Sequence, residues 1–450
     1  MRPSFWPTHP WSRRRLIGAV ALALGGVAGN GKDPRVHAAR SLAGSPCTAG
    51  GLAFTHGRAD GNRLVGGRGT FPIVAPLDLA LGGRPRWVVA ASEDGTTSVW
   101  VVVLADGQAQ AFRVTASAAE PIPMVTDGAV RPPEMPPLLR VRDGRATLVA
   151  APAGSHPSPL APPLPLGDGL ALIDADGALL VWGTADRAQA PSRFPLAAPR
   201  DARLVTDGAG RVALLTGRAS DRYDHGVLGD AVEATGFAIV DVSPPELAQQ
   251  VHLPPPDVIE GLAPLWADLD GDGAPEIVVT VSSASDGGRL VVYSGAGERL
   301  AVGPGFGRAD RWRQPLAVAP FGPAGEIELA AVRTPHIGGV VEFWRLEGTE
   351  LRPVAELPGY TSHVLGSRNL DLAIGGDFDG DGQPELVLPS QDRTRLGAIR
   401  RIERGPGAVV AWDLPLGGVL ATNMAAVGLG GGMALGNGRE DGVLRLWLPA

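Results

Sequence analysis

Beyond residue 40 the chain alternates between short apolar runs and turns rich in glycine, proline, aspartate and asparagine. The runs are rich in β-branched residues and are four to seven residues long, which is the length of ordinary strands. In this part of the sequence no segment sustains the i, i+3, i+4, i+7 apolar spacing of an amphipathic helix. The pattern therefore predicts an all-β fold made of many short strands.

The strand pattern repeats along the chain. A proline- or leucine-rich opening, a Gly/Asp turn and a β-branched run recur in seven segments, which begin near Pro76, Pro137, Pro199, Pro264, Pro315, Asp371 and Ala421. Successive segments are 50 to 65 residues apart, slightly above the roughly 40 to 50 residues of a propeller blade. The repeat predicts a single β-propeller of seven blades, each a four-stranded antiparallel sheet.

Each repeat also contains one apolar strand with a large aromatic residue. We expect these aromatic side chains to pack between neighbouring sheets rather than to form a platform for sugars. They are Trp100, Trp182, Phe237, Tyr293, Trp344, Trp412 and Trp447.

The last repeat is short, because the chain ends 29 residues after Ala421. An N-terminal strand, at Leu52 to Phe54 or at Arg63 to Val65, is expected to complete its sheet and close the ring without an open edge. The proline-rich stretch from Pro152 to Pro165 is interpreted as a long loop inside the second repeat.

Composition narrows the choice of partners and of stabilising chemistry. The 63 glycines and 42 prolines fit a fold with many turns. A formal net charge of -7 makes nucleic acid an unexpected partner. The single cysteine, Cys47, cannot form a disulfide within the chain. We expect a monomer held together by packing, with metal ions in support.

The first 40 residues have the pattern of an export signal. Ser12-Arg13-Arg14-Arg15-Leu16-Ile17 leads into an apolar run of 13 residues that ends at Ala28, too short to span a bilayer as a helix. The paired arginines resemble a twin-arginine signal, with an ordinary secretory signal as the alternative. We therefore expect a leader over residues 1–40, a propeller over 41–450, no transmembrane segment in the mature chain, and a periplasmic or secreted protein.

Two loops carry evenly spaced acidic residues. In each loop the carboxylates stand at positions 1, 3, 5 and 9, with glycine at position 6, where it permits a tight curl. We expect those carboxylates and the carbonyl of position 7 to form an oxygen cage for calcium. The expected ligands are Asp268, Asp270, Asp272, Ala274 and Glu276 in the first loop, and Asp377, Asp379, Asp381, Gln383 and Glu385 in the second.

An EF-hand begins in the same way but places its bidentate glutamate at position 12 and continues as a helix. Position 12 is Val279 in the first loop and Leu388 in the second, and a β-rich run follows each loop. The spacing therefore excludes an EF-hand.

At residues 267–278 and 376–387 the sequence resembles the FG-GAP/VCBS repeat family, found in integrin α-chain-like propellers and in exported bacterial proteins. The resemblance implies calcium in a loop that joins the first two strands of a blade, and ligand recognition on the other face. It covers two of the seven repeats, because the other five lack the acidic residues.

The loops expected on that other face are polar and contain several cationic or histidine side chains. By analogy with related propellers, these could surround one funnel that receives a carboxylate, a phosphate or an acidic glycan. The candidates are Arg222, Tyr223, His225, His336, Arg393, Arg395 and Arg439.

Three functions remain open at this stage. The first is an exported calcium-binding propeller that acts as a binding or scaffold module for an unknown protein or glycan, without catalysis. The second is a propeller enzyme that acts on polysaccharide or uses a quinone cofactor. The third is a purely structural surface protein. The absence of a nucleophile motif such as GxSxG favours the first.

Overall fold

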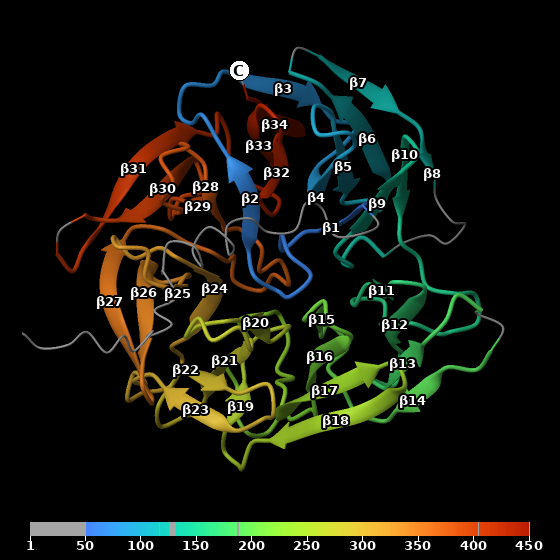
Figure 1. The fold of residues 1–450 in the computed structure, drawn as a ribbon, viewed down its shortest axis with the longest axis vertical. Coiled ribbons are helices and arrows are strands. Elements are labelled where there is room, and N and C mark those ends of the chain that lie inside the picture. The colour runs from blue at the N-terminus through green and yellow to red at the C-terminus, as the bar shows by residue number, and fades with distance from the viewer. Residues whose placement is uncertain (1–50, 117, 126–131, 187–188, 404, 450) are drawn as a thin grey trace, which may run out of the picture. The chain divides into compact units, whose positions relative to one another are not determined.

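The computed structural model describes residues 51–116, 118–125, 132–186, 189–403 and 405–449. They belong to one compact unit. The predicted leader over residues 1–40 and Cys47 lie outside the described residues. Within these ranges the elements are 34 β-strands (Figure 1), which confirms the prediction of an all-β fold. Among the described residues, no helix has the length and apolar character needed to cross a membrane.

Three sheets are four-stranded antiparallel meanders of consecutive strands. Their strands are β4 (Pro85–Ser92), β5 (Ser98–Leu104), β6 (Ala109–Val114) and β7 (Ala119–Ile122); β11 (Leu164–Leu166), β12 (Gly169–Ile173), β13 (Leu179–Trp182) and β14 (Ser192–Phe194); and β15 (Val205–Thr206), β16 (Arg211–Thr216), β17 (Gly236–Val242) and β18 (Pro245–His252).

A nine-stranded sheet consists of two further groups of strands. A single parallel pairing, between Val302 and Glu350, joins the two groups. The first group contains β19 (Val258–Ile259), β20 (Leu265–Ala267), β21 (Glu276–Ser282), β22 (Arg289–Tyr293) and β23 (Arg299–Val302). The second contains β24 (Arg313–Ala319), β25 (Glu328–Arg333), β26 (Val340–Glu347) and β27 (Glu350–Pro358).

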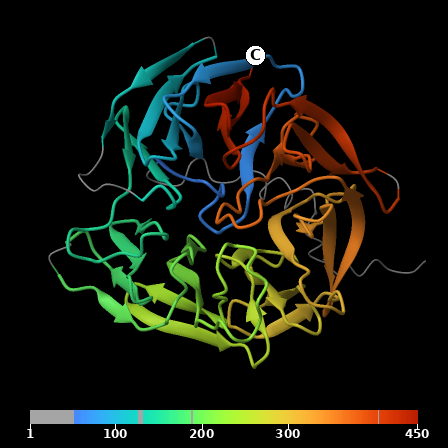
Figure 2. The same ribbon diagram turned by 180° about the vertical axis from the view of Figure 1, so that it is seen from behind.

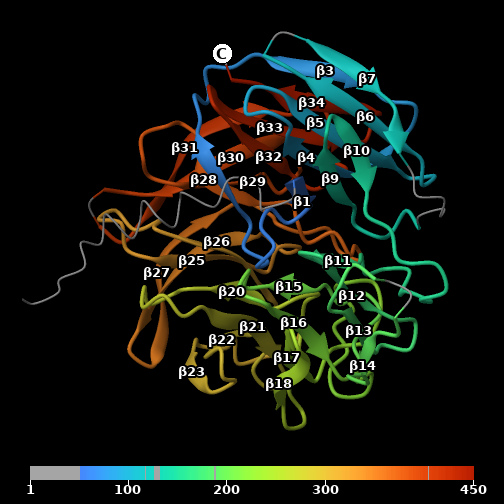
Figure 3. The same cartoon turned by 45° about the vertical axis from the view of Figure 1, so that its right-hand side comes forward.

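The remaining three sheets each take one strand from the N-terminal part of the chain (Figures 1 and 3). β1 (Leu52–Phe54) joins β8 (Met124–Val125), β9 (Leu138–Arg142) and β10 (Arg145–Leu148). β2 (Leu64–Arg68) joins β28 (Ile374–Asp377), β29 (Glu385–Pro389), β30 (Arg395–Arg401) and β31 (Ala408–Pro415). β3 (Pro76–Ala80) joins β32 (Ala425–Leu429), β33 (Gly432–Arg439) and β34 (Val443–Trp447).

An N-terminal strand does complete the last sheet, but it is β3 and not either of the two predicted segments. β3 pairs with β34 in antiparallel register from Pro76 to Ala80. Its side chains alternate between exposed and half-buried, which suits an outer strand. Leu52–Phe54 and Leu64 instead lie in two other sheets, and Leu64 is buried.

The second predicted repeat is also divided differently. β9 and β10 lie in one sheet, whereas β11 begins at Leu164, inside the proline-rich stretch, and opens another sheet. The interpretation of that stretch as a loop within one repeat is therefore wrong. The reason is that β9 and β10 pair with strands from distant or irregular segments, β1 and β8, so the local pattern contains only half of their sheet.

The core lies between sheets that follow one another along the chain. All seven repeated aromatic residues are buried, with at most 6% of their surface exposed, which confirms their predicted packing role. One apolar cluster joins Trp100 of β5 to Leu444 and Leu446 of β34, so the last sheet packs against the sheet of β4–β7.

A buried ionic cluster fixes the N-terminal segment among the inner strands, where β1 and β2 are seen from both sides (Figures 1 and 2). Asp371, which has no exposed surface, accepts hydrogen bonds from Arg63 Nη2 at 3.1 Å, Arg203 Nη1 at 2.6 Å and Thr55 Oγ1 at 2.8 Å. The two guanidinium groups and the neighbouring His56 lower the pKa of Asp371 below its ordinary value, although burial opposes the shift. The carboxylate is therefore charged at neutral pH.

We expect Asp371→Asn to destabilise the protein by about 3 to 5 kcal/mol, because two buried guanidinium groups lose their anionic partner. The measurement is urea unfolding at pH 7. The matched control is Asp441→Asn, which removes an exposed partner of Arg439 and should cost less than about 1 kcal/mol. Equal losses for the two variants would contradict the role assigned to Asp371.

Candidate metal centres

The first acidic loop joins β20 to β21, and a strand follows it, as the exclusion of an EF-hand requires. Ala267 and Glu276 are paired in register, so the loop closes directly on the sheet. Asp268 accepts hydrogen bonds from the backbone of Gly271 at 2.7 Å and Gly273 at 3.0 Å. Both glycines have positive φ, 78° and 93°, which permits the curl.

Carboxylates converge inside this loop. One oxygen from each of Asp268, Asp270 and Glu276 lies within 4.8 Å of the others. Asp270 and Asp272 each also accept a bond from the backbone N–H two residues further on, at 3.0 and 2.7 Å. Unbound, three such carboxylates repel one another, so this geometry suits a shared cation.

The second acidic loop joins β28 to β29 with the same backbone pattern. Here Asp377, Asp379 and Asp381 bring one oxygen each within 4.8 Å of the others. Asp377 accepts from Gly382 N at 3.2 Å, and Asp379 from Asp381 N at 3.0 Å. The Gln383 side chain donates to the carbonyl of Phe321 at 3.2 Å, which leaves its own backbone carbonyl as the expected ligand.

The last acid of each loop is buried at the start of a strand. Glu276 Oε2 accepts from Leu269 N at 2.7 Å, and Glu385 Oε2 accepts from Phe378 N at 2.9 Å. Burial raises the pKa of Glu276 to about 7, and burial with the neighbouring Asp379 raises the pKa of Glu385 to about 9. Glu385 Oε1 is buried and has no hydrogen-bond partner among the described residues. A buried oxygen without a donor fits a position that faces a cation.

The two loops differ in their cationic neighbours. In the second loop Arg68 Nε lies 3.2 Å from Asp377 Oδ2, and Arg400 Nη1 lies 2.9 Å from Asp381 Oδ2. In the first loop no ion pair to Asp268, Asp270 or Asp272 is present within the described part of the chain. Arginines therefore partly neutralise the second loop, while the aspartates of the first loop have no such cationic partner among the described residues.

The residues predicted to form a cationic funnel separate into two sets. Tyr223 and His225 have ring centroids 5.7 Å apart. Burial, and after it the neighbouring His225, lowers the pKa of His336. The arginines are engaged by nearby acceptors: Arg222 by the carbonyls of Leu253 and Asp257, Arg393 by Leu420 O, Arg395 by Asp413, and Arg439 by Asp78 and Asp441. In the described segments no bond or ring contact joins Arg393, Arg395 or Arg439 to the tyrosine and the histidines.

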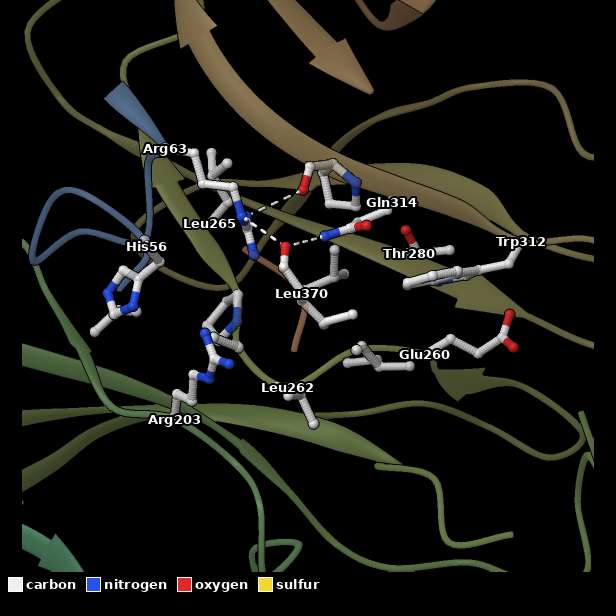
Figure 4. Close-up of a pocket in the computed structure, with 18 residues that line it drawn as sticks. His56, Arg63, Arg203, Glu260, Leu262, Leu265, Thr280, Trp312, Gln314 and Leu370 are labelled. Carbon is white, nitrogen blue, oxygen red and sulfur yellow. Dashed lines mark hydrogen bonds between the residues drawn. The ribbon is translucent and has the colours of Figure 1, made fainter. Parts of the chain in front are cut away.

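A small cavity of about 40 Å³ lies beside the buried ionic cluster (Figure 4). Arg63 donates to the carbonyls of Leu370 and Pro315, and Gln314 Nε2 also donates to Leu370 O at 2.6 Å. Trp312 Nε1 and His56 Nε2 are buried without hydrogen-bond partners among the described residues. The cavity has room for a few water molecules at most.

Several residues of these sites were not among the sequence-based candidates. Glu260, Trp312 and His363 are buried, and each contacts a residue from a distant loop. They lie singly in apolar runs or turns, so no local spacing marks them. The long-range pairing of the loops is the signal that identifies them.

Comparison with known proteins identifies the fold and no family. No protein-family model and no curated protein matches the sequence. The structure is similar to quinohemoprotein alcohol dehydrogenase from Comamonas testosteroni, with 10% identity, a TM-score of 0.55, and coverage of 92% of this chain and 84% of that one. Quinohemoprotein alcohol dehydrogenase ADHIIG from Pseudomonas putida HK5 gives 11% identity, a TM-score of 0.50, and coverage of 89% and 80%. The fold is thus of the β-propeller kind.

Glu385→Gln should leave the metal-free protein at least as stable as the wild type. At pH 7 a carboxyl group whose pKa is about 9 is neutral, so the substitution exchanges one neutral group for another of the same shape. The measurement is urea unfolding in excess chelator, with Asp377→Asn as the comparison. A loss above about 2 kcal/mol for Glu385→Gln would contradict the protonated state.

Proposed function

We propose that the chain is an exported, calcium-binding β-propeller that acts as a binding or scaffold module and carries out no catalysis. The observation that supports calcium most directly is the convergence of three carboxylate oxygens within 4.8 Å in each of two loops. Calcium takes six to eight oxygen ligands in flexible loops, and these loops offer carboxylates and backbone carbonyls.

We further propose that the sheets are the blades of one closed ring. The strand groups number eight among the described residues when the two halves of the nine-stranded sheet are counted separately, one more than the seven predicted repeats. The pairing of β3 with β34 and the packing of the last sheet against β5 support closure. A closed ring has no exposed sheet edge at which chains could aggregate.

The residues of both loops fit calcium. The proposed ligands are those predicted from the sequence, including the backbone carbonyls of Ala274 and Gln383. The unpartnered Glu385 Oε1 adds a buried oxygen that has no donor among the described residues. A bound ion would neutralise the carboxylates and hold each turn against its sheet. The loops themselves provide the tight turn, the hydrogen bonds from backbone N–H groups to the aspartates, and the buried positions of Glu276 and Glu385.

The export proposal and the calcium proposal support each other. Calcium modules that work outside the cell bind with Kd of roughly 0.1 to 1 mM, a range matched to calcium levels outside the cytoplasm. A twin-arginine-like leader would bring the chain to such a compartment. The partner that we propose for the module is a protein or a glycan, and nucleic acid is disfavoured by the net charge of -7.

A quinone-dependent enzyme is the alternative function, and the likeness to two quinohemoprotein dehydrogenases concerns the fold alone. The cavity beside Trp312 measures about 40 Å³. Sites for ligands the size of a cofactor are about 300 to 1,000 Å³. The cavity beside Trp312 is therefore too small for a bound quinone, and we derive no redox step for the chain.

Chelation of calcium should lower the melting temperature of the wild-type protein. At a free calcium concentration ten times Kd, each site contributes about 1.4 kcal/mol, so the effect should be present near millimolar calcium and lost in chelator. The double variant Asp270→Ala/Asp379→Ala should show little difference between the two conditions.

The matched control for that experiment is Asp106→Ala/Asp392→Ala. These two aspartates also accept a bond from the backbone N–H two residues further on, but they lie outside the acidic loops. The control should keep the calcium response of the wild type. A calcium response that survives in Asp270→Ala/Asp379→Ala would show that the assigned ligands are wrong.

Arg68→Gln should strengthen calcium binding at the second loop by about two- to five-fold, since it removes an exposed guanidinium that competes for Asp377. The titration is made by calorimetry in the Asp270→Ala background, where only the second loop binds. Arg352→Gln, at an exposed ion pair in β27, is the control. A weaker affinity for Arg68→Gln would place Arg68 in support of the site instead of in competition with it.

A further inference from the structure

Four loops that contact one another carry three histidines and a buried carboxylate, in segments other than the acidic loops. Glu260, which is 2% exposed, accepts from Ser282 Oγ, and its Oε1 lies 2.6 Å from His225 Nδ1. A carboxylate only accepts, so His225 carries its proton on Nδ1 and presents the lone pair of Nε2. The buried carboxylate thus fixes both the tautomer and the orientation of the His225 ring.

A second imidazole is fixed in the same way through a relay. His363 is 2% exposed, and its Nε2 lies 2.5 Å from the carbonyl oxygen of Ser367. A carbonyl cannot donate, so this nitrogen bears the proton. His363 Nδ1 then accepts from His336 Nε2, 2.5 Å away, because a neutral imidazole holds one proton and that of His363 is on Nε2. His336 is left with an unprotonated Nδ1.

The loops that carry His225 and His336 are held side by side by contacts on both flanks. The Tyr223 ring is next to that of His225, and its hydroxyl accepts from Asp310 N at 2.9 Å. Two residues further on, Trp312 stacks on His336 with ring planes 18° apart, and its carbonyl accepts from Thr334 N at 2.8 Å.

The loop before β28 contacts the loop that carries His225. Gly366 N donates to Val227 O at 2.9 Å, so the segment that contains His363 lies against the segment that contains His225. Val227 and Trp312 belong to one apolar cluster. Both His225 and His336 are partly exposed, while His363 and Glu260 behind them are buried. Solvent therefore reaches the two front rings and not the groups that orient them.

The imidazoles of His225 and His336 each have one ring nitrogen without a hydrogen-bond partner among the described residues. The other ring nitrogen of each donates to a buried acceptor. In histidine ligands of metals the second N–H commonly donates to a carboxylate or a carbonyl group; His225 donates to a carboxylate, and His336 donates to an imidazole that a carbonyl group holds. We propose that His225 Nε2 and His336 Nδ1 together bind one divalent transition-metal ion, with water in the remaining positions. Two neutral imidazoles favour Cu²⁺ over Ni²⁺ and Zn²⁺.

This site is independent of the calcium proposal. Its donors are nitrogens, whereas the acidic loops offer oxygens, and the two chemistries select different metals. It also lies at the β16–β17 and β25–β26 turns, whereas the acidic loops are the β20–β21 and β28–β29 turns.

The test is a titration of the untagged protein with Cu²⁺ in the presence of a glycine competitor, followed by calorimetry and by electron paramagnetic resonance. We expect one site with hyperfine coupling from two imidazole nitrogens. His225→Ala and His336→Ala should each weaken binding at least ten-fold. Glu260→Gln should weaken it by about 10- to 100-fold, because the orientation of His225 is lost while its ligand nitrogen remains.

Two controls separate this site from other histidines and from calcium. His252→Ala, at an exposed position in β18, and Asp270→Ala/Asp379→Ala should both bind Cu²⁺ as the wild type does. Circular dichroism and urea unfolding establish that each histidine variant is folded. Unchanged Cu²⁺ affinity in folded His225→Ala or His336→Ala, or coupling from a single imidazole nitrogen, would overturn the proposal.

Discussion

The charge of Asp371 is the constraint on which the arrangement of this molecule rests. A carboxylate with no exposed surface is stable only because two guanidinium groups reach it, Arg63 from the N-terminal segment and Arg203 from the loop before β15. These three residues are far apart in the sequence, so their contact defines how the N-terminal segment lies among the inner strands. The directional bonds to two carboxylate oxygens specify one position, whereas apolar packing alone would tolerate several.

The same N-terminal segment contacts both strands that lead into the acidic loops. Asp60 O accepts from Trp266 N at 2.9 Å, immediately before the first loop. Gly69 N donates to Asp377 O at 2.8 Å, and a side chain at Gly69 would lie 1.8 Å from the carbonyl oxygen of Phe378. Only glycine allows the backbones to approach so closely. The buried ion cluster thereby supports the two candidate calcium loops through one continuous segment.

Local pattern was sufficient to predict the all-β fold, the burial of the seven aromatic residues and the strands that follow the acidic loops. These features depend on alternation and turn residues within about ten positions. The division of the second repeat was missed because β9 and β10 pair with β1 and β8. The strand that completes the last sheet was misplaced because β1, β2 and β3 are all short, and pattern alone does not specify which sheet a short strand joins.

The candidate sites show the same division between local and long-range information. The carboxylates of the acidic loops come together because nine consecutive residues contain them, so spacing alone predicts their convergence. The set of His225, His336, His363 and Glu260 is assembled from four loops, and each member is unremarkable in its own segment. Sequence reasoning placed His225 and His336 on one face from the order of strands. It could not show that Glu260 and His363 stand behind them, because that depends on which loops the packing of Trp312 and Val227 brings into contact. A property that makes the two front histidines chemically distinct, the fixed tautomer, therefore arises only in the folded chain.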